Sequence, residues 1–77
     1  MLFLIEYDRS RGKIVTFQSF GDLEREAAEN SRLELELKLS RQGQEREVVL
    51  LEAASEDALR LTHRRYFEDL SELVRAS

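Results

Sequence analysis

The stretch Leu33-Glu34-Leu35-Glu36-Leu37-Lys38-Leu39 alternates leucine with a charged residue without a break. In an extended strand the four leucines would share one face, and the three charged residues would share the other. In a helix the same leucines would lie on two opposite sides, although leucine, glutamate and lysine all favour helices. We give more weight to the periodicity, which predicts a strand over residues 33–39 with one apolar and one charged face.

Three further segments also have the composition of strands, at residues 2–8, 13–19 and 45–53. They differ from 33–39 because they carry apolar residues on both faces, in the runs Leu2-Phe3-Leu4-Ile5, Ile14-Val15 and Val48-Val49-Leu50-Leu51. One layer of helices would not cover so much apolar surface. The sequence therefore predicts that part of the sheet needs a partner.

Short links with glycine near their ends join the predicted strands in pairs. Residues 9–12 end in Gly12, and residues 40–44 contain Gly43, as expected for hairpins that need a positive φ angle. A helical pattern follows each pair. The first begins near Asp22, ends near residues 30–31 and is rich in acids. The second begins after Ser55, a good N-cap residue, and its apolar stripe is made of Leu59, Tyr66, Leu70, Leu73 and Val74.

This order predicts an α+β fold of the type ββαββα, with a four-stranded, mainly antiparallel sheet and both helices packed on one face. Seventy-seven residues make a single domain, 1–77. A shift of 34 residues aligns the apolar runs at 14–17 and 48–51, so two ββα halves, 1–31 and 32–77, are one interpretation. A domain this small buries only about 60% of its unfolded surface, and self-association is a common remedy.

Composition excludes several classes of function. The chain has no cysteine, which excludes disulfides and thiolate chemistry and suits a reducing compartment. We find no phosphate-binding glycine loop, no metal-ligand cluster and no nucleophile beside a base, so we expect no cofactor and no catalysis. We also expect no membrane span, since no apolar run approaches the roughly 18 residues required. These features predict a non-enzymatic protein of the cytoplasm.

The single histidine, His63, lies within the predicted apolar stripe of the second helix. It could serve a ligand-binding or pH-sensing role at the boundary between helix and sheet. A half-buried ring that packs against the core is the simpler interpretation, because no nucleophile or metal ligand accompanies it. Arg60, Arg64 and Arg65 surround it, but acidic residues follow directly, which favours a solvated helix face.

Basic residues near the two predicted turns are the best candidates for contact with a polyanion. They are Arg9, Arg11, Lys13, Arg41 and Arg46. Clustered at one end of the sheet, they could orient the protein on RNA or DNA. The net charge of −4, from 16 acids and 12 bases, weakens this hypothesis. No aromatic residue interleaves these bases, so a base-stacking platform is not expected.

The sequence thus favours a protein-interaction module that forms a homodimer through an uncovered sheet face or an edge strand. The residues expected on the uncovered face are Leu2, Leu4, Ile14, Val48 and Leu50. An accessory RNA- or DNA-binding protein that uses the basic turns is the alternative.

Overall fold

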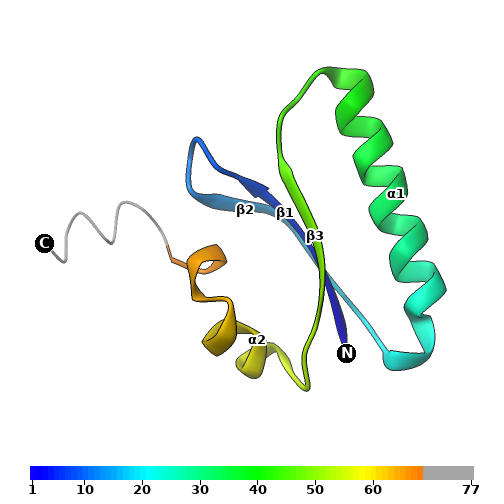
Figure 1. Ribbon diagram of the computed structural model, residues 1–77, viewed down its shortest axis with the longest axis vertical. Helices are drawn as coiled ribbons and strands as arrows, with labels where there is room; N and C mark the ends of the chain where they lie inside the picture. The colour runs from blue at the N-terminus through cyan, green and yellow to red at the C-terminus, as the bar shows by residue number, and fades with distance from the viewer. Residues whose placement is uncertain (69–77) are drawn as a thin grey trace, which may run out of the picture.

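The apolar strand β1 (Leu2–Asp8) lies at the centre of a three-stranded sheet in the computed structural model, which describes residues 1–68 (Figure 1). Its neighbours are β2 (Lys13–Phe20) on one side and β3 (Glu47–Glu52) on the other, and both run antiparallel to it. All seven residues of β1 are buried. Burial on both faces agrees with its apolar sequence, since a half-wetted strand would alternate.

The predicted hairpin between β1 and β2 is confirmed. Gly12 has a φ angle of 65°, and its N–H donates to the carbonyl oxygen of Asp8 at 2.8 Å. The ladder is interrupted next to the turn, because Thr16 lies opposite Glu6 whereas Ile14 lies opposite Tyr7. Val15 is thus an extra residue in β2. Such a bulge bends the edge of a sheet and interrupts its pairing.

The predicted strand over 33–39 is wrong, because these residues belong to the helix α1 (Arg25–Gln42). Leu35 and Leu39 are four residues apart and face the sheet, where Leu39 is buried. Leu33 and Leu37 have the same spacing on the opposite side, where they are 54% and 47% exposed. The alternating pattern is therefore the superposition of two helical stripes, only one of which packs in the described core.

Glycines lie at both ends of the segment that forms α1, and Gly43 is the one that the sequence places in a hairpin turn. A single 3-10 turn, η1 (Asp22–Glu24), leads into the helix, and Glu24 accepts a hydrogen bond from the Gly21 N–H at 2.8 Å. Gly43 ends the helix with a φ angle of 64°, and Gln44 donates to the carbonyl of Leu39 at 3.0 Å. Gly43 is thus a helix C-cap and not the turn of a second hairpin.

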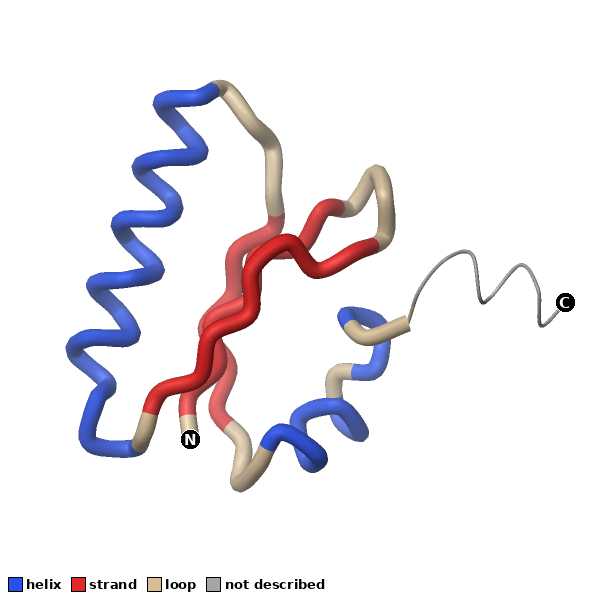
Figure 2. The backbone as a smooth tube through the Cα atoms, turned by 180° about the vertical axis from the view of Figure 1, so that it is seen from behind, coloured by secondary structure: helices blue, strands red, loops and turns tan. Residues whose placement is uncertain are grey.

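The second helix, α2 (Glu56–Thr62), follows β3 and lies on the face of the sheet opposite α1 (Figures 1 and 2). The predicted N-cap is confirmed, since the Ser55 hydroxyl accepts a hydrogen bond from the Ala58 N–H at 3.1 Å. The helix stops at Thr62, and a 3-10 turn, η2 (Arg64–Tyr66), continues the chain. The predicted stripe residues Leu70, Leu73 and Val74 lie outside the described residues.

The observed order within the described chain is therefore ββαβα, and the helices cover both faces of three strands. The α+β class and the antiparallel pairing are confirmed, whereas the fourth strand and the single helix layer are not found in residues 1–68. The tentative boundary between residues 31 and 32 lies inside α1, which runs through it.

Each helix closes its own layer of core. On the α1 side, Leu2, Leu4, Phe20 and Ala28 form a buried cluster. On the α2 side the buried cluster is Phe3, Ile5, Tyr7, Leu59 and Tyr66. Aromatic rings dominate this second layer, where Phe3 stacks on Phe17 at 5.7 Å and Tyr7 meets Tyr66 edge to face at 5.2 Å.

The two leucine pairs of α1 make the helical assignment testable. Replacing the buried Leu39 with alanine should lower the free energy of unfolding by about 2–4 kcal/mol, because it leaves a cavity against the sheet. Replacing the exposed Leu37 should change it by less than about 0.5 kcal/mol. Urea denaturation of both variants measures the difference. Equal losses would contradict the helix, since a strand with one apolar face would bury both leucines alike.

Candidate functional site

The five residues that the sequence assigns to an uncovered sheet face lie within the folded core. Leu2 and Leu4 are each 2% exposed. Val48 and Leu50 pack on their cluster beneath α1, and Ile14 packs on the cluster at the α2 side. The five residues do not form one uncovered face, because α1 covers Leu2, Leu4, Val48 and Leu50, whereas Ile14 lies on the α2 side.

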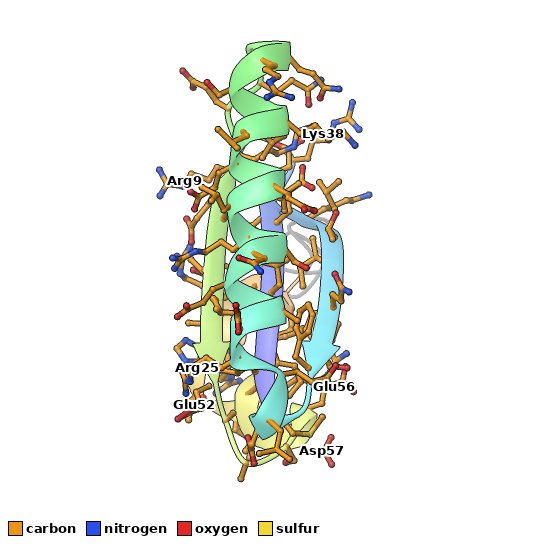
Figure 3. All side chains as sticks on the ribbon, turned by 90° about the vertical axis from the view of Figure 1, so that its right-hand side faces the viewer. Arg9, Arg25, Lys38, Glu52, Glu56 and Asp57 are labelled. Carbon is orange, nitrogen blue, oxygen red and sulfur yellow. The ribbon has the colours of Figure 1, made fainter. Side chains whose placement is uncertain are left out.

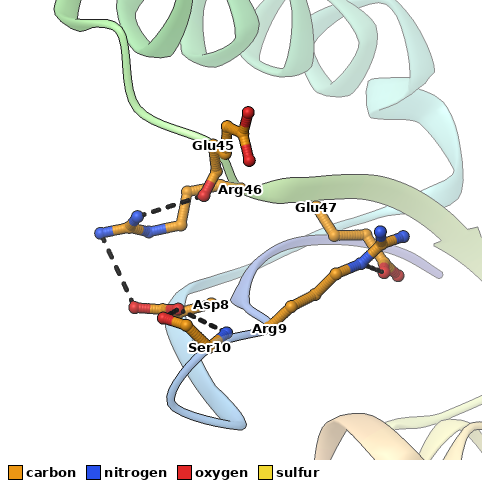
Figure 4. Close-up of a pocket in the computed structure, with 6 residues that line it drawn as sticks. All are labelled: Asp8, Arg9, Ser10, Glu45, Arg46 and Glu47. Atoms are coloured by element: carbon orange, nitrogen blue, oxygen red, sulfur yellow. Dashed lines mark hydrogen bonds and ion pairs between the residues drawn. The ribbon is translucent and has the colours of Figure 1, made fainter.

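Four of the five predicted polyanion-contact residues lie in or beside the β1–β2 turn and the first residues before β3. Arg9 and Arg46 line an open hollow of about 550 Å³ together with Asp8, Ser10, Glu45 and Glu47 (Figure 4). Arg11 and Lys13 lie in and just after the turn. The fifth residue, Arg41, is in the last turn of α1 and is exposed.

Buried carboxylates hold the bases at this end of the sheet. Asp8 Oδ1 accepts three hydrogen bonds, from the hydroxyl and N–H of Ser10 and from the N–H of Arg11. These bonds, with the Ser10 hydroxyl as the largest cause, hold the pKa of Asp8 below its ordinary value. Arg46 reaches Asp8 at 3.9 Å and Glu6 Oε2 at 3.4 Å. Its Nε is buried and donates no hydrogen bond in the structure.

A second carboxylate, that of Glu47 in β3, gathers groups from two other elements, the β1–β2 turn and η2, on the α2 side. Its Oε1 accepts from Arg9 Nε at 2.8 Å, and its Oε2 accepts from Arg65 at 2.5 Å and from the Tyr66 hydroxyl. The hydrogen bond from Tyr66, followed by those from the two arginines, keeps the pKa of Glu47 below its ordinary 4.5. Burial and the neighbouring carboxylate raise the pKa of Tyr66, which therefore stays a neutral donor.

Three of the five candidate bases, Arg9, Arg11 and Arg46, are paired with carboxylates, whereas Lys13 and Arg41 are exposed and make no ion pair within residues 1–68. The carboxylates of Glu6, Asp8 and Glu47 are almost fully buried and face the guanidinium groups directly. The cluster therefore serves first to fasten the turn, β3 and η2 together, and the hypothesis of nucleic-acid binding stays a prediction from sequence.

His63 lies at the end of α2, where its backbone N–H donates to the Leu59 carbonyl at 2.8 Å. Its ring is half-buried, with its centroid 6.4 Å from that of Tyr66. Among residues 1–68 there is no group of three or more histidines and acids that could hold a metal ion. Its ligand-binding or pH-sensing role stays a prediction.

The two outer strands of the sheet differ in a way that matters for binding. Figure 3 shows β2 and β3 on either side of β1 behind α1, so each has an edge that faces away from β1. The edge of β2 carries the Val15 bulge and begins with Lys13, both of which discourage pairing with another strand. The edge of β3 has the sequence Glu-Val-Val-Leu-Leu-Glu, without bulge, proline or lysine.

The edge of β3 is a candidate interface that the sequence identifies only in part. An edge strand is one of its two candidate interfaces, but the identity of that strand depends on the strand order, which the misassigned residues 33–39 obscured. The apolar run Val48–Leu51 is the available signal. All four side chains are half-buried, because they stand at the border of the two core layers.

Comparisons with protein-family models, with curated proteins and with solved structures found no match. None of the helices in residues 1–68 combines the length and the apolar character that crossing a membrane requires. The functional interpretation therefore rests on the geometry described above.

The Glu47 cluster gives a pH-dependent prediction. Because the pKa of Glu47 is lowered on folding, its contribution is complete above the ordinary value of 4.5 and is lost as the pH falls below it. Glu47→Gln should cost about 1–2 kcal/mol near pH 7 and should show a smaller loss of stability between pH 7 and about pH 3 than the parent chain. Urea midpoints at both pH values measure this. The exposed Glu45→Gln is the control, and an unchanged acid profile for Glu47→Gln would refute the assignment.

Proposed function

We propose that this chain is a protein-interaction module that forms a homodimer by antiparallel pairing of its β3 strands. The observation that supports this most is the edge of β3, an apolar strand edge without the usual protective devices. In the part of the chain that the structure describes, β3 is paired with β1 alone. Half of its peptide groups thus point away from the sheet and are available to a second strand.

The shape of the molecule supports pairing at this edge. The Cα atoms span 42 × 33 × 12 Å, and the shortest of these extents is about the width of three neighbouring strands. The molecule is therefore narrow in the direction that runs across the strands of the sheet. Figure 1 looks down this shortest axis, and no described segment lies in front of β3. The half-buried side chains of Val48, Val49, Leu50 and Leu51 therefore stand at an open side of both core layers. A second copy would extend the sheet to six strands and close this side.

The edge of β3 is complementary to a second copy of itself. The apolar centre of β3 matches itself, and the charged residues Glu47 and Glu52 lie at its two ends. In an antiparallel pair the Glu47 end of one copy lies beside the Glu52 end of the other, so the acidic residues stay at the two ends of the shared ladder and none lies at its centre. Symmetric pairing of this kind is a common form of homodimer.

The proposal describes binding without catalysis, in keeping with the composition of the chain. The absence of cysteine from the sequence agrees with a reducing compartment, and we place the dimer in the cytoplasm on that ground.

A lysine at the centre of the edge should separate the dimer. Val49→Lys is expected to weaken dimerisation at least about tenfold, because the ammonium group would have to be desolvated between two paired strands. Light scattering across a micromolar concentration series measures the mass, and circular dichroism checks that the variant is folded. Val15→Lys on the edge of β2 is the matched control and should leave the dimer intact. A parent chain that stays monomeric throughout would overturn the proposal.

A further inference from the structure

We infer that the two-fold axis of the dimer passes beside Val49, so that Arg46 of each copy faces Glu52 of the partner subunit. The inference rests on the homodimer proposed above and adds the register of pairing and the residues that select it. It follows from the alternation of side chains in β3, from the charges at its ends and from the way Arg46 is held.

The faces of the sheet limit the registers to a few. Directly opposed residues of an antiparallel pair project to the same face. A two-fold axis perpendicular to the sheet keeps the α1 side of one copy next to the α1 side of the other. One residue of β3 must then lie directly opposite the same residue of the partner subunit, and the axis passes between these two copies of it. Near the middle of β3 the axis can therefore lie beside Val48, Val49 or Leu50.

Charge pairing separates these three registers. With the axis beside Val48, Arg46 faces Leu50 and Glu52 faces Gln44, so neither gains a partner of opposite charge. With the axis beside Leu50, Glu52 faces Val48 and gains no partner. With the axis beside Val49, Val48 faces Leu50 and Arg46 faces Glu52, which matches apolar with apolar and base with acid. Glu47 then faces Leu51, but its carboxylate is already satisfied by Arg9, Arg65 and Tyr66.

The two members of the proposed pair differ in how far they are engaged within their own copy. The Arg46 guanidinium contacts Glu6 at 3.4 Å and Asp8 at 3.9 Å and donates to the Glu45 carbonyl at 3.3 Å. Its Nε is buried, but the side chain is 22% exposed, and a contact with Glu52 of the partner subunit would use this exposed part. Glu52 is 61% exposed and its one ion pair in the structure of residues 1–68 is with Arg25. Arg46 and Glu52 project to the α1 side of the sheet, as do Val48 and Leu50.

The flank of α1 beside β3 supports the same antiparallel arrangement. Arg25 contacts Glu52 on this side, and both lie at the same margin of the molecule in Figure 3. The flank continues along the helix with Glu29, Arg32 and Glu36, so the sign of the charge alternates from one turn to the next. An antiparallel copy can set unlike charges of such a row beside each other.

A cysteine scan tests the register, because the chain has no cysteine of its own. Residues on the axis lie opposite their own copies, at a Cα separation that a disulfide can bridge. Under a mild oxidant Val49→Cys should therefore form a covalent dimer faster, by about tenfold or more, than Val48→Cys or Leu50→Cys. Val15→Cys on the other edge controls for collisional cross-linking. Denaturing gel electrophoresis without reductant measures the rates.

The outcomes of the scan separate the two proposals. Fastest cross-linking at position 49 supports the register. Fastest cross-linking at position 48 or 50, in a protein that is dimeric by light scattering, overturns the register and leaves the homodimer standing. No cross-linking above the Val15→Cys control at any of the three positions, in a monomeric protein, overturns both.

A charge reversal tests the ion pair itself. Glu52→Lys should weaken the dimer about tenfold, because each of two symmetric contacts with Arg46 changes from attraction to repulsion. Glu56→Lys makes the same charge change at an exposed position just after β3 and should have little effect. Sedimentation measures the dissociation constants, and equal weakening by Glu52→Lys and Glu56→Lys would rule out the pair.

Discussion

The burial of β1 on both faces is the constraint on which the rest of this structure depends. Its sequence, Leu-Phe-Leu-Ile-Glu-Tyr-Asp, offers apolar groups to each side of the sheet in turn, so each side needs a helical cover. The connections provide this cover, with α1 between β2 and β3 and α2 after β3. The polar end of β1 is buried as well, and its carboxylates find partners there. Glu6 accepts a hydrogen bond from Thr16 at 2.8 Å, and Asp8 accepts from Ser10.

Local signals in the sequence predict much of this architecture. The hairpin around Gly12, the first two strands, the apolar run of β3 and the Ser55 cap all depend on residues close together in the chain. The segment 33–39 fails because four leucines at alternate positions satisfy a strand and two helical stripes equally well. Gly43 adds to the error, since a glycine at positive φ ends a helix as readily as it closes a hairpin. Helices on both faces of the sheet are not predicted either, because residues 33–39, which the pattern assigns to a strand, belong to the helix that covers one of those faces.

The Glu47 cluster could not be predicted from sequence, because its members meet through tertiary contacts. Arg9, Glu47 and Tyr66 come from the turn, β3 and η2, and Tyr66 reaches the carboxylate only because α2 stops at Thr62. A continuous helix through residue 66 would have placed its ring differently. The apolar surface of the strands led to the prediction of a partner. Within residues 1–68 the chain's own helices cover most of that surface, and the part left over is the open side of β3.

An edge of this kind couples folding to association. Because the sheet is only three strands wide, residues 48–51 contribute to both core layers and still keep part of their surface in contact with solvent. Each isolated copy therefore gains only part of the free energy that full burial of these side chains would give. In the dimer proposed above, pairing at β3 would supply the remainder and join the unpaired peptide groups, so the stability of the fold would rise with protein concentration. The bulge in β2 makes the other edge a poor template, which would limit growth to two copies and prevent an open fibre.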